Sequence, residues 1–121
     1  MGKKILVVDD DPGVHFIITP ILSRAGYTVM SAKTGEQGLQ LALNGRPDLI
    51  ILDVIMPYMK GRELCAKIKA YDVLKDTPVI FLTAIDSPDD IHEEMKVGAV
   101  AHLTKPIEIE QVIATVKGII G

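Results

Sequence analysis

Short runs of aliphatic residues recur along the chain, and two of them end directly on carboxylates. Ile5-Leu6-Val7-Val8 is followed by Asp9-Asp10-Asp11, and the run from Leu49 to Leu52 is followed by Asp53. A short unbroken apolar run bounded by turn residues is typical of a strand buried on both faces, as in parallel sheets. We therefore predict two central strands whose carboxyl ends carry acidic side chains.

The rest of the chain alternates between helical and strand patterns. The apolar residues Ile17, Ile18, Ile21, Leu22 and Ala25 recur at helical spacing, after a capping Asp11 and before a terminating Gly26. Further strands are predicted at 28–32, 78–83 and 100–104, and further helices at 35–43, 62–70, 88–98 and 108–120. Strands that alternate with helices indicate a parallel sheet covered by helices on both faces.

The predicted fold class is α/β. A chain of 121 residues fits one domain, so we assign residues 1–121 to it. At this length we expect a flavodoxin-like, doubly wound sheet of five parallel strands in the order 2-1-3-4-5, with five helices distributed over both faces. The point where the strand order reverses then lies between the first and third strands, and ligands bind at such a point.

The predicted topology brings five polar side chains to the carboxyl edge of the sheet. The first and third strands end in Asp9-Asp10 and in Asp53, while the fourth and fifth end in Thr83 and Lys105. Each residue has an ordinary alternative: the aspartates could cap helices, Thr83 could be a strand-end hydroxyl and Lys105 a solvated loop residue. Their joint placement favours a functional site, with Lys105 aimed inward by a cis bond to Pro106 as one option.

Composition limits the classes of function. Hydrophobic residues make up 48% of the chain and aromatic residues 4%, so the core must be aliphatic. A net charge of −3 leaves no basic stripe, so direct nucleic-acid binding is not expected. The single Cys65 excludes an internal disulfide, is expected in the core, and fits the cytoplasm. No apolar run approaches the roughly 18 residues of a membrane span.

The residue types at the carboxyl edge suit phosphoryl chemistry. Neighbouring carboxylates repel unless a cation intervenes, and an oxygen-only ligand set indicates a hard ion, Mg²⁺ above all. Lys105 would supply a fixed positive charge and Thr83 a hydroxyl donor. Asp53 could then attack a phosphoryl group in line and form an acyl phosphate.

The chain resembles the response-regulator receiver domain of two-component signalling over essentially its whole length. The motifs that carry the resemblance are Val7-Val8-Asp9-Asp10, Leu52-Asp53 with Met56-Pro57, Phe81-Leu82-Thr83-Ala84, Gly98-Ala99 and Lys105-Pro106. The resemblance implies a phosphoacceptor module rather than a conventional enzyme. Its expected partners are a sensor histidine kinase or histidine phosphotransfer protein and a downstream effector or output domain.

The resemblance also implies the role of each site residue. Asp53 would be the phosphoacceptor and would bind Mg²⁺ directly together with Asp10. Asp9 would bind the ion mainly through water, and the backbone carbonyl of Ile55 would complete the protein ligands. Lys105 would contact the phosphoryl group.

A conformational switch is implied as well. Thr83 would move toward the phosphoryl group, and a usually aromatic residue three positions before Lys105 would turn inward, remodelling the surface formed by 88–120. That position is His102, which departs from the family pattern; an ordinary strand residue is an equally supported interpretation. A histidine switch would make signalling sensitive to pH.

Other departures concern the first helix. Pro20 lies inside it, so we expect a kink or a break there and an altered docking surface for phosphodonor proteins. Phe16 is predicted to point outward beside His15 and is a candidate docking anchor, although a partly buried helix residue is the favoured interpretation. His15 and His92 are expected at the surface.

Two further expectations concern the loops after the third and fourth strands. Pro57 and Gly61 should keep the first of these loops out of helix, and Lys60 should be a surface residue of little chemical effect. By analogy with the family, Ile55 and Ile85 flank the path of the hydrolytic water. Two branched apolar side chains should obstruct that path, so we predict a long-lived phosphoryl group.

Three rival functions fit the sequence less well. A haloacid-dehalogenase-like phosphatase needs a second carboxylate where Ile55 stands. A flavodoxin-like cofactor binder needs a phosphate-cradling loop, where Asp9-Asp10-Asp11 would repel phosphate. A receiver-like partner-binding domain that takes no phosphate is disfavoured because every expected site residue is present.

The sequence is compatible with more than one kind of whole protein and with more than one oligomeric state. The chain is expected to end just past its last helix, and a free-standing regulator, a phosphorelay intermediate and part of a larger protein are all compatible with that. A weak homodimer through the 88–120 surface is also compatible with the resemblance.

Overall fold

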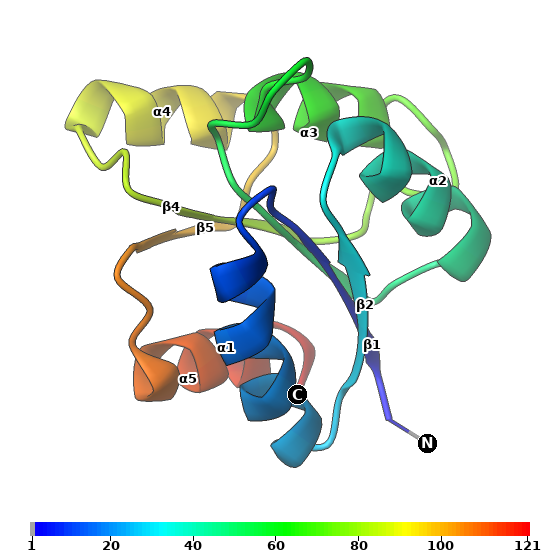
Figure 1. The fold of residues 1–121 in the computed structure, drawn as a ribbon. Coiled ribbons are helices and arrows are strands. Elements are labelled where there is room, and N and C mark those ends of the chain that lie inside the picture. Colours follow the sequence, from blue (N-terminus) through cyan, green and yellow to red (C-terminus); the bar gives the residue numbers. More distant parts are fainter. Residues whose placement is uncertain (1) are drawn as a thin grey trace.

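The computed structural model describes residues 2–121, in which strands and helices alternate throughout (Figure 1). The strands are β1 (Lys4–Val8), β2 (Thr28–Ala32), β3 (Leu49–Leu52), β4 (Val79–Thr83) and β5 (Ala101–Thr104). The helices are α1 (Pro12–Arg24), α2 (Gly35–Gly45), α3 (Gly61–Lys69), α4 (Pro88–Lys96) and α5 (Ile109–Ile120).

The five strands form one parallel sheet in the order β2-β1-β3-β4-β5. Helices α1 and α5 cover one face of this sheet, and α2, α3 and α4 cover the other (Figure 1). This arrangement confirms the predicted α/β class, strand order and two helical layers. None of the helices in residues 2–121 is both long and apolar enough to cross a bilayer.

The central strands are buried on both faces because alternate side chains point into two separate cores. In β1, Ile5 and Val7 pack in the α1/α5 layer, while Leu6 and Val8 pack in the layer of α2 and α3. All four residues of β3 are likewise at most 1% exposed. Burial of each such side chain contributes roughly 1.5–3 kcal/mol, so the apolar runs fix the sheet and thereby the positions of the residues that follow them.

Side-chain caps set the starts of α1, α2 and α4, and the cap of α1 is the predicted Asp11. The side chain of Asp11 accepts a hydrogen bond from the backbone N–H of Gly13 at 2.9 Å. Thr34 and Ser87 cap α2 and α4 in the same way. After α4, Gly98 adopts a φ of 110°, a left-handed conformation that favours glycine.

Cys65 lies in the core of the α3 layer, as predicted. It is fully buried, and its thiol donates a hydrogen bond to the backbone oxygen of Val97 at 3.4 Å. Burial raises the pKa of the Cys65 thiol to about 11, so the group stays protonated and unreactive near neutral pH.

Helix α1 runs without a break from Pro12 to Arg24 with the exposed Pro20 inside it, so the alternative of a break is absent and the alternative of a kink stays a prediction. Two other local predictions are wrong. Ile17, expected on the inner face, is 46% exposed. Gly61 is the first residue of α3, so it begins the helix that it was expected to hold off.

Candidate functional site

The register of the sheet brings the polar strand ends together. Val8 pairs with Leu52, so the next residues, Asp9 and Asp53, lie side by side at the carboxyl edge. The backbone N–H of Asp53 donates to the Val8 oxygen at 3.1 Å, which extends the ladder to the acidic residue itself. The site is therefore positioned by sheet hydrogen bonds and not by a flexible loop.

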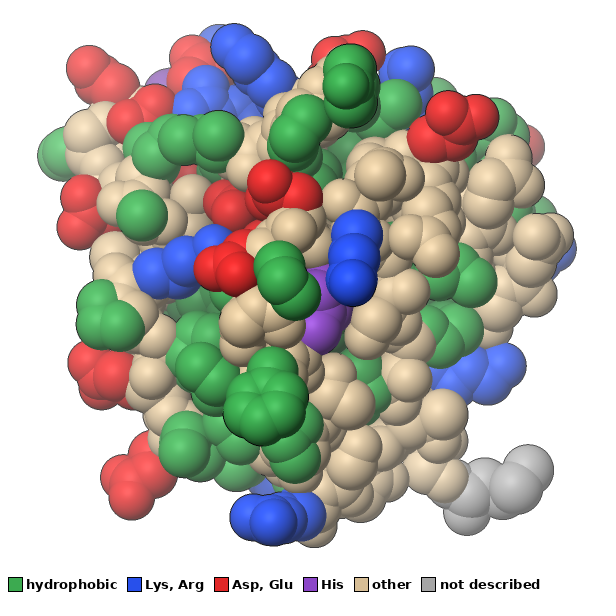
Figure 2. Space-filling model, in the orientation of Figure 1, with side chains coloured by type: hydrophobic (Ala, Val, Ile, Leu, Met, Phe, Trp, Pro, Cys, Tyr) green, Lys and Arg blue, Asp and Glu red, His purple; other side chains and the backbone are tan. Residues whose placement is uncertain are grey.

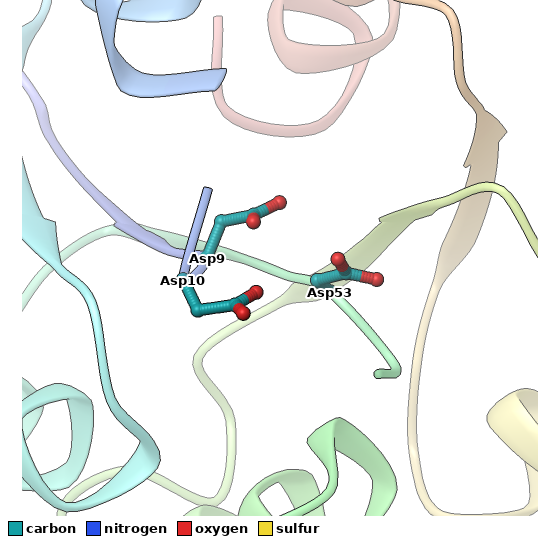
Figure 3. Close-up of side chains that lie close together, drawn as sticks. All are labelled: Asp9, Asp10 and Asp53. Carbon is teal, nitrogen blue, oxygen red and sulfur yellow. The ribbon is translucent and has the colours of Figure 1, made fainter. Parts of the chain in front are cut away.

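Three carboxylates share this edge. Asp9, Asp10 and Asp53 each offer an oxygen within 4.8 Å of the others. Asp9 and Asp53 are buried, whereas Asp10 is exposed. Figure 3 shows the first two residues following β1 and the third following β3, with their carboxylates gathered over one region of the sheet edge.

Lys105 reaches this cluster from the end of β5. Its Nζ lies 2.9 Å from Oδ2 of Asp9 and 3.0 Å from Oδ2 of Asp53. Burial alone would lower the pKa of Lys105, but the hydrogen bonds and attraction of the two carboxylates outweigh it and raise that pKa. The amine is thus a fixed cation. The peptide bond from Lys105 to Pro106 is cis. We call Asp9, Asp10, Asp53 and Lys105 the acidic notch.

The surroundings of Asp9 in the acidic notch disfavour its ionised form. Burial raises its pKa above the ordinary value, and repulsion from Asp53 adds to the effect. A hydrogen bond from the backbone N–H of Asp11 and contact with Lys105 act in the opposite direction without cancelling it. One ammonium leaves three carboxylates under-compensated, which is the electrostatic condition for holding a further cation.

Thr83 and two isoleucines border the acidic notch. Thr83 is 1% exposed at the end of β4, and its hydroxyl accepts a hydrogen bond from the N–H of Ile85 at 3.3 Å. Asp53 accepts one from the N–H of Ile55 at the same distance. The side chains of Ile55 and Ile85 help to line a cavity of about 370 Å³ together with Val54, Met56, Lys60 and Arg62.

Gly61 holds the loop after Asp53 in place. Its N–H donates to the Val54 oxygen at 2.8 Å, and a Cβ at this position would lie 1.9 Å from the backbone oxygen of Asp53. Glycine is therefore required for close backbone approach and not merely for a turn. The sequence contained no signal for this contact, because it joins two segments that approach only in the folded chain.

His15 is buried and contacts the backbone of Asp9 in the acidic notch, so the prediction of a surface residue is wrong. It is only 9% exposed, and its Nε2 donates to the backbone oxygen of Asp9 at 2.7 Å. Its spacing three residues before Ile18 and seven before Leu22 places it on the buried stripe of α1, which was the available signal. His92 is exposed, as predicted.

Phe16 projects from the same helix into solvent. It is 83% exposed, which confirms the predicted outward orientation, whereas the interpretation of a partly buried residue is wrong. Ile17 of the same helix is half-exposed, and a hydrophobic patch is visible over α1 (Figure 2). Acidic side chains gather close by, near the end of β1 (Figure 2).

The family model of the response regulator receiver domain matches residues 5–117. The chain belongs to this family. Sporulation initiation phosphotransferase F of Bacillus subtilis is 35% identical over 117 residues, which cover 97% of this receiver domain and 93% of that protein. The alkaline phosphatase synthesis transcriptional regulatory protein PhoP of the same organism is 38% identical, and the match covers 99% of this receiver domain and 49% of PhoP.

Solved structures agree with the family. The chemotaxis protein CheY4 of Vibrio cholerae has a TM-score of 0.95 at 34% identity, covering 99% of this receiver domain and 100% of that chain. The receiver domain of the sensor histidine kinase PA1611 of Pseudomonas aeruginosa, solved with magnesium in its active-site cleft, has a TM-score of 0.91 at 28% identity, with 100% and 99% covered. The chain spans about half the length of several curated relatives, such as PhoP.

This receiver domain has a histidine where the resemblance leads us to expect an aromatic residue. The Nδ1 of His102 lies 2.6 Å from Oε1 of Glu94, and its Nε2 lies 3.2 Å from the hydroxyl of Thr104. Glu94 is fully buried on α4. Sequence reasoning missed Glu94 because the polar run of His92, Glu93 and Glu94 resembles an ordinary solvated helix face.

We predict that Gly61→Ala destabilises the receiver domain, because the new methyl group would overlap the backbone of Asp53. The free energy of unfolding in a urea titration should fall by about 1–3 kcal/mol or more. Gly118→Ala is the matched control, since a Cβ there meets nothing within 4 Å and alanine favours helix. Equal loss in both variants would contradict the close approach at Gly61.

Proposed function

We propose that this receiver domain accepts a phosphoryl group on Asp53 from a sensor histidine kinase or a histidine phosphotransfer protein. The observation that carries the proposal is the pairing of the Asp53 carboxylate with the Lys105 ammonium at 3.0 Å, beside Asp9 and Asp10. The printed name of a relative that matches over nearly its full length, a sporulation initiation phosphotransferase, supports it.

The transfer uses groups that the chain itself supplies. An oxygen of Asp53 forms a bond to phosphorus while the phosphorus–nitrogen bond of the donor phosphohistidine breaks and the imidazole leaves. Lys105, already a fixed cation, pairs with the phosphoryl oxygens. The hydroxyl of Thr83 at the end of the neighbouring strand then donates a hydrogen bond to the product.

Asp9, Asp10 and Asp53 would hold Mg²⁺, with the backbone carbonyl of Ile55 as a further ligand. Their oxygen-only donor set, their spacing within 4.8 Å and the raised pKa of Asp9 fit a hard divalent cation. Bound there, Mg²⁺ supplies positive charge that offsets the carboxylates and the incoming phosphoryl group. A similar solved receiver domain with magnesium in its cleft supports this assignment.

The exposed apolar residues of α1 are the proposed docking surface for the phosphodonor protein. Phe16 and Ile17 are 83% and 46% exposed, and α1 begins directly after the acidic notch. A partner seated there would bring its phosphohistidine over Asp53 while burying apolar area.

Phosphorylation is proposed to act on the face formed by α4, β5 and α5 through Thr83 and His102, in the cytoplasm. That face would then control an effector or an attached output domain. Some curated relatives of which this chain spans about half are named as transcriptional regulators. A net charge of −3 favours a domain that regulates such an output without contacting nucleic acid itself.

The direct test is incubation of the purified chain with acetyl phosphate and Mg²⁺, followed by intact mass spectrometry. We expect the mass of one added phosphoryl group, and its loss after chelation of the metal or in Asp53→Ala. The matched control is Asp86→Ala, which removes an exposed carboxylate from the loop after β4. Unchanged labelling of Asp53→Ala would overturn the assignment.

The lifetime of the phosphoryl group tests the role of the flanking isoleucines. Ile55 is 61% exposed, so substitution there should not disturb the core. We expect slow loss of radiolabelled phosphate from the wild type and at least about tenfold faster loss from Ile55→Asn, because a polar side chain can orient the attacking water. Ile55→Val is the control and should stay slow. A wild-type half-life of seconds would contradict the prediction.

A further inference from the structure

Glu94 is an unusual carboxylate because it lies fully buried on the inner side of α4. Its exposed fraction is 0%, and its Oε1 lies 2.6 Å from Nδ1 of His102 on β5. The second oxygen, Oε2, is buried without a hydrogen-bond partner among the residues the structure describes. A buried carboxylate of this kind is tolerated only when a strong partner compensates for lost hydration, and here that partner is His102.

His102 is also buried, and both of its ring nitrogens make contacts. Its side chain is 8% exposed, and its other ring nitrogen lies 3.2 Å from the hydroxyl of Thr104. Its two ring nitrogens thus contact one residue of α4 and one residue of β5. An outward or further inward rotation of the imidazole would break the contact with Glu94 and leave that carboxylate unpaired.

The pair also connects α4 to the acidic notch. Thr104 is the register partner of Thr83 and directly precedes Lys105, whose backbone N–H donates to the Thr83 oxygen at 2.9 Å. A displacement of β4 or of the end of β5 at the acidic notch would therefore move Thr104, which lies two residues after His102 and contacts its ring. The contact between Glu94 and His102 is closed in this structure, and a displacement that opened it would free α4 to move.

We propose that the Glu94–His102 pair is a latch that holds α4 against β5 in the unphosphorylated receiver domain. Glu94 is the positioning residue of this latch, and His102 acts through it as the switch in place of an aromatic side chain. The inference rests on the proposed phosphorylation of Asp53. A latch differs from a purely structural contact because it stabilises one of two conformational states, whereas a structural contact stabilises both.

Coupling between sites is reciprocal, which makes the latch measurable at the acidic notch. Beryllofluoride with Mg²⁺ mimics a phosphoryl group on Asp53. If the closed latch stabilises the unphosphorylated state, weakening it must tighten beryllofluoride binding, since less free energy is then spent on opening the latch.

The experiment compares the full chain with Glu94→Gln in a beryllofluoride titration followed by NMR. We expect Glu94→Gln to bind about fivefold more tightly or better. Glu93→Gln is the matched control, because Glu93 is a half-exposed neighbour that pairs only loosely with Lys96 at 3.7 Å, and its affinity should equal that of the wild type. Unchanged or weaker binding by Glu94→Gln would overturn the latch.

A second readout uses the wild-type chain alone and so does not depend on the folding of a variant. The proton in the short Nδ1–Oε1 contact should give a far-downfield imidazole resonance assigned to His102, and saturation with beryllofluoride should abolish it. Persistence of that resonance at saturation would also overturn the latch. Failure of the proposed function has a different signature, since the wild type would then bind no beryllofluoride at all.

Discussion

The ammonium of Lys105 lies between two buried carboxylates, 2.9 Å from Asp9 and 3.0 Å from Asp53. These contacts join the ends of β1, β3 and β5, although β5 pairs in the sheet with β4 alone. Without this amine the two buried carboxylates would face each other uncompensated, at a cost of several kcal/mol. With it, the acidic notch still carries excess negative charge, which suits a divalent cation and a phosphoryl group together.

Much of this arrangement was predictable because it depends on local signals. Apolar runs of four residues mark strands that are buried on both faces, and the capping Asp11 marks a helix start without reference to the rest of the chain. Once the strand order is known, the register of β1 and β3 places Asp9 beside Asp53. The convergence of the notch residues thus follows from topology and not from any one motif.

The contacts that sequence reasoning missed are tertiary. The backbone of Gly61 lies so close to the backbone of Asp53 that a side chain would not fit. Glu94 points from α4 toward β5, where it contacts His102. His15 looked like a polar surface residue, yet it sits on the apolar stripe of α1 and donates to Asp9. Phe16 is the converse, a large apolar residue that was predicted to point outward and does lie in solvent. For His15 and Glu94 the polar residue type indicated the surface, whereas the orientation of the helix buries both side chains.

The acidic notch is proposed to hold a divalent cation beside Asp53. Calorimetric titration of the purified chain with Mg²⁺ measures that binding. We expect one saturable site, weakened about tenfold or more in Asp10→Asn and unchanged in Asp11→Asn, whose asparagine still caps α1. Absence of saturable binding, or equal affinity in Asp10→Asn and the wild type, would contradict it.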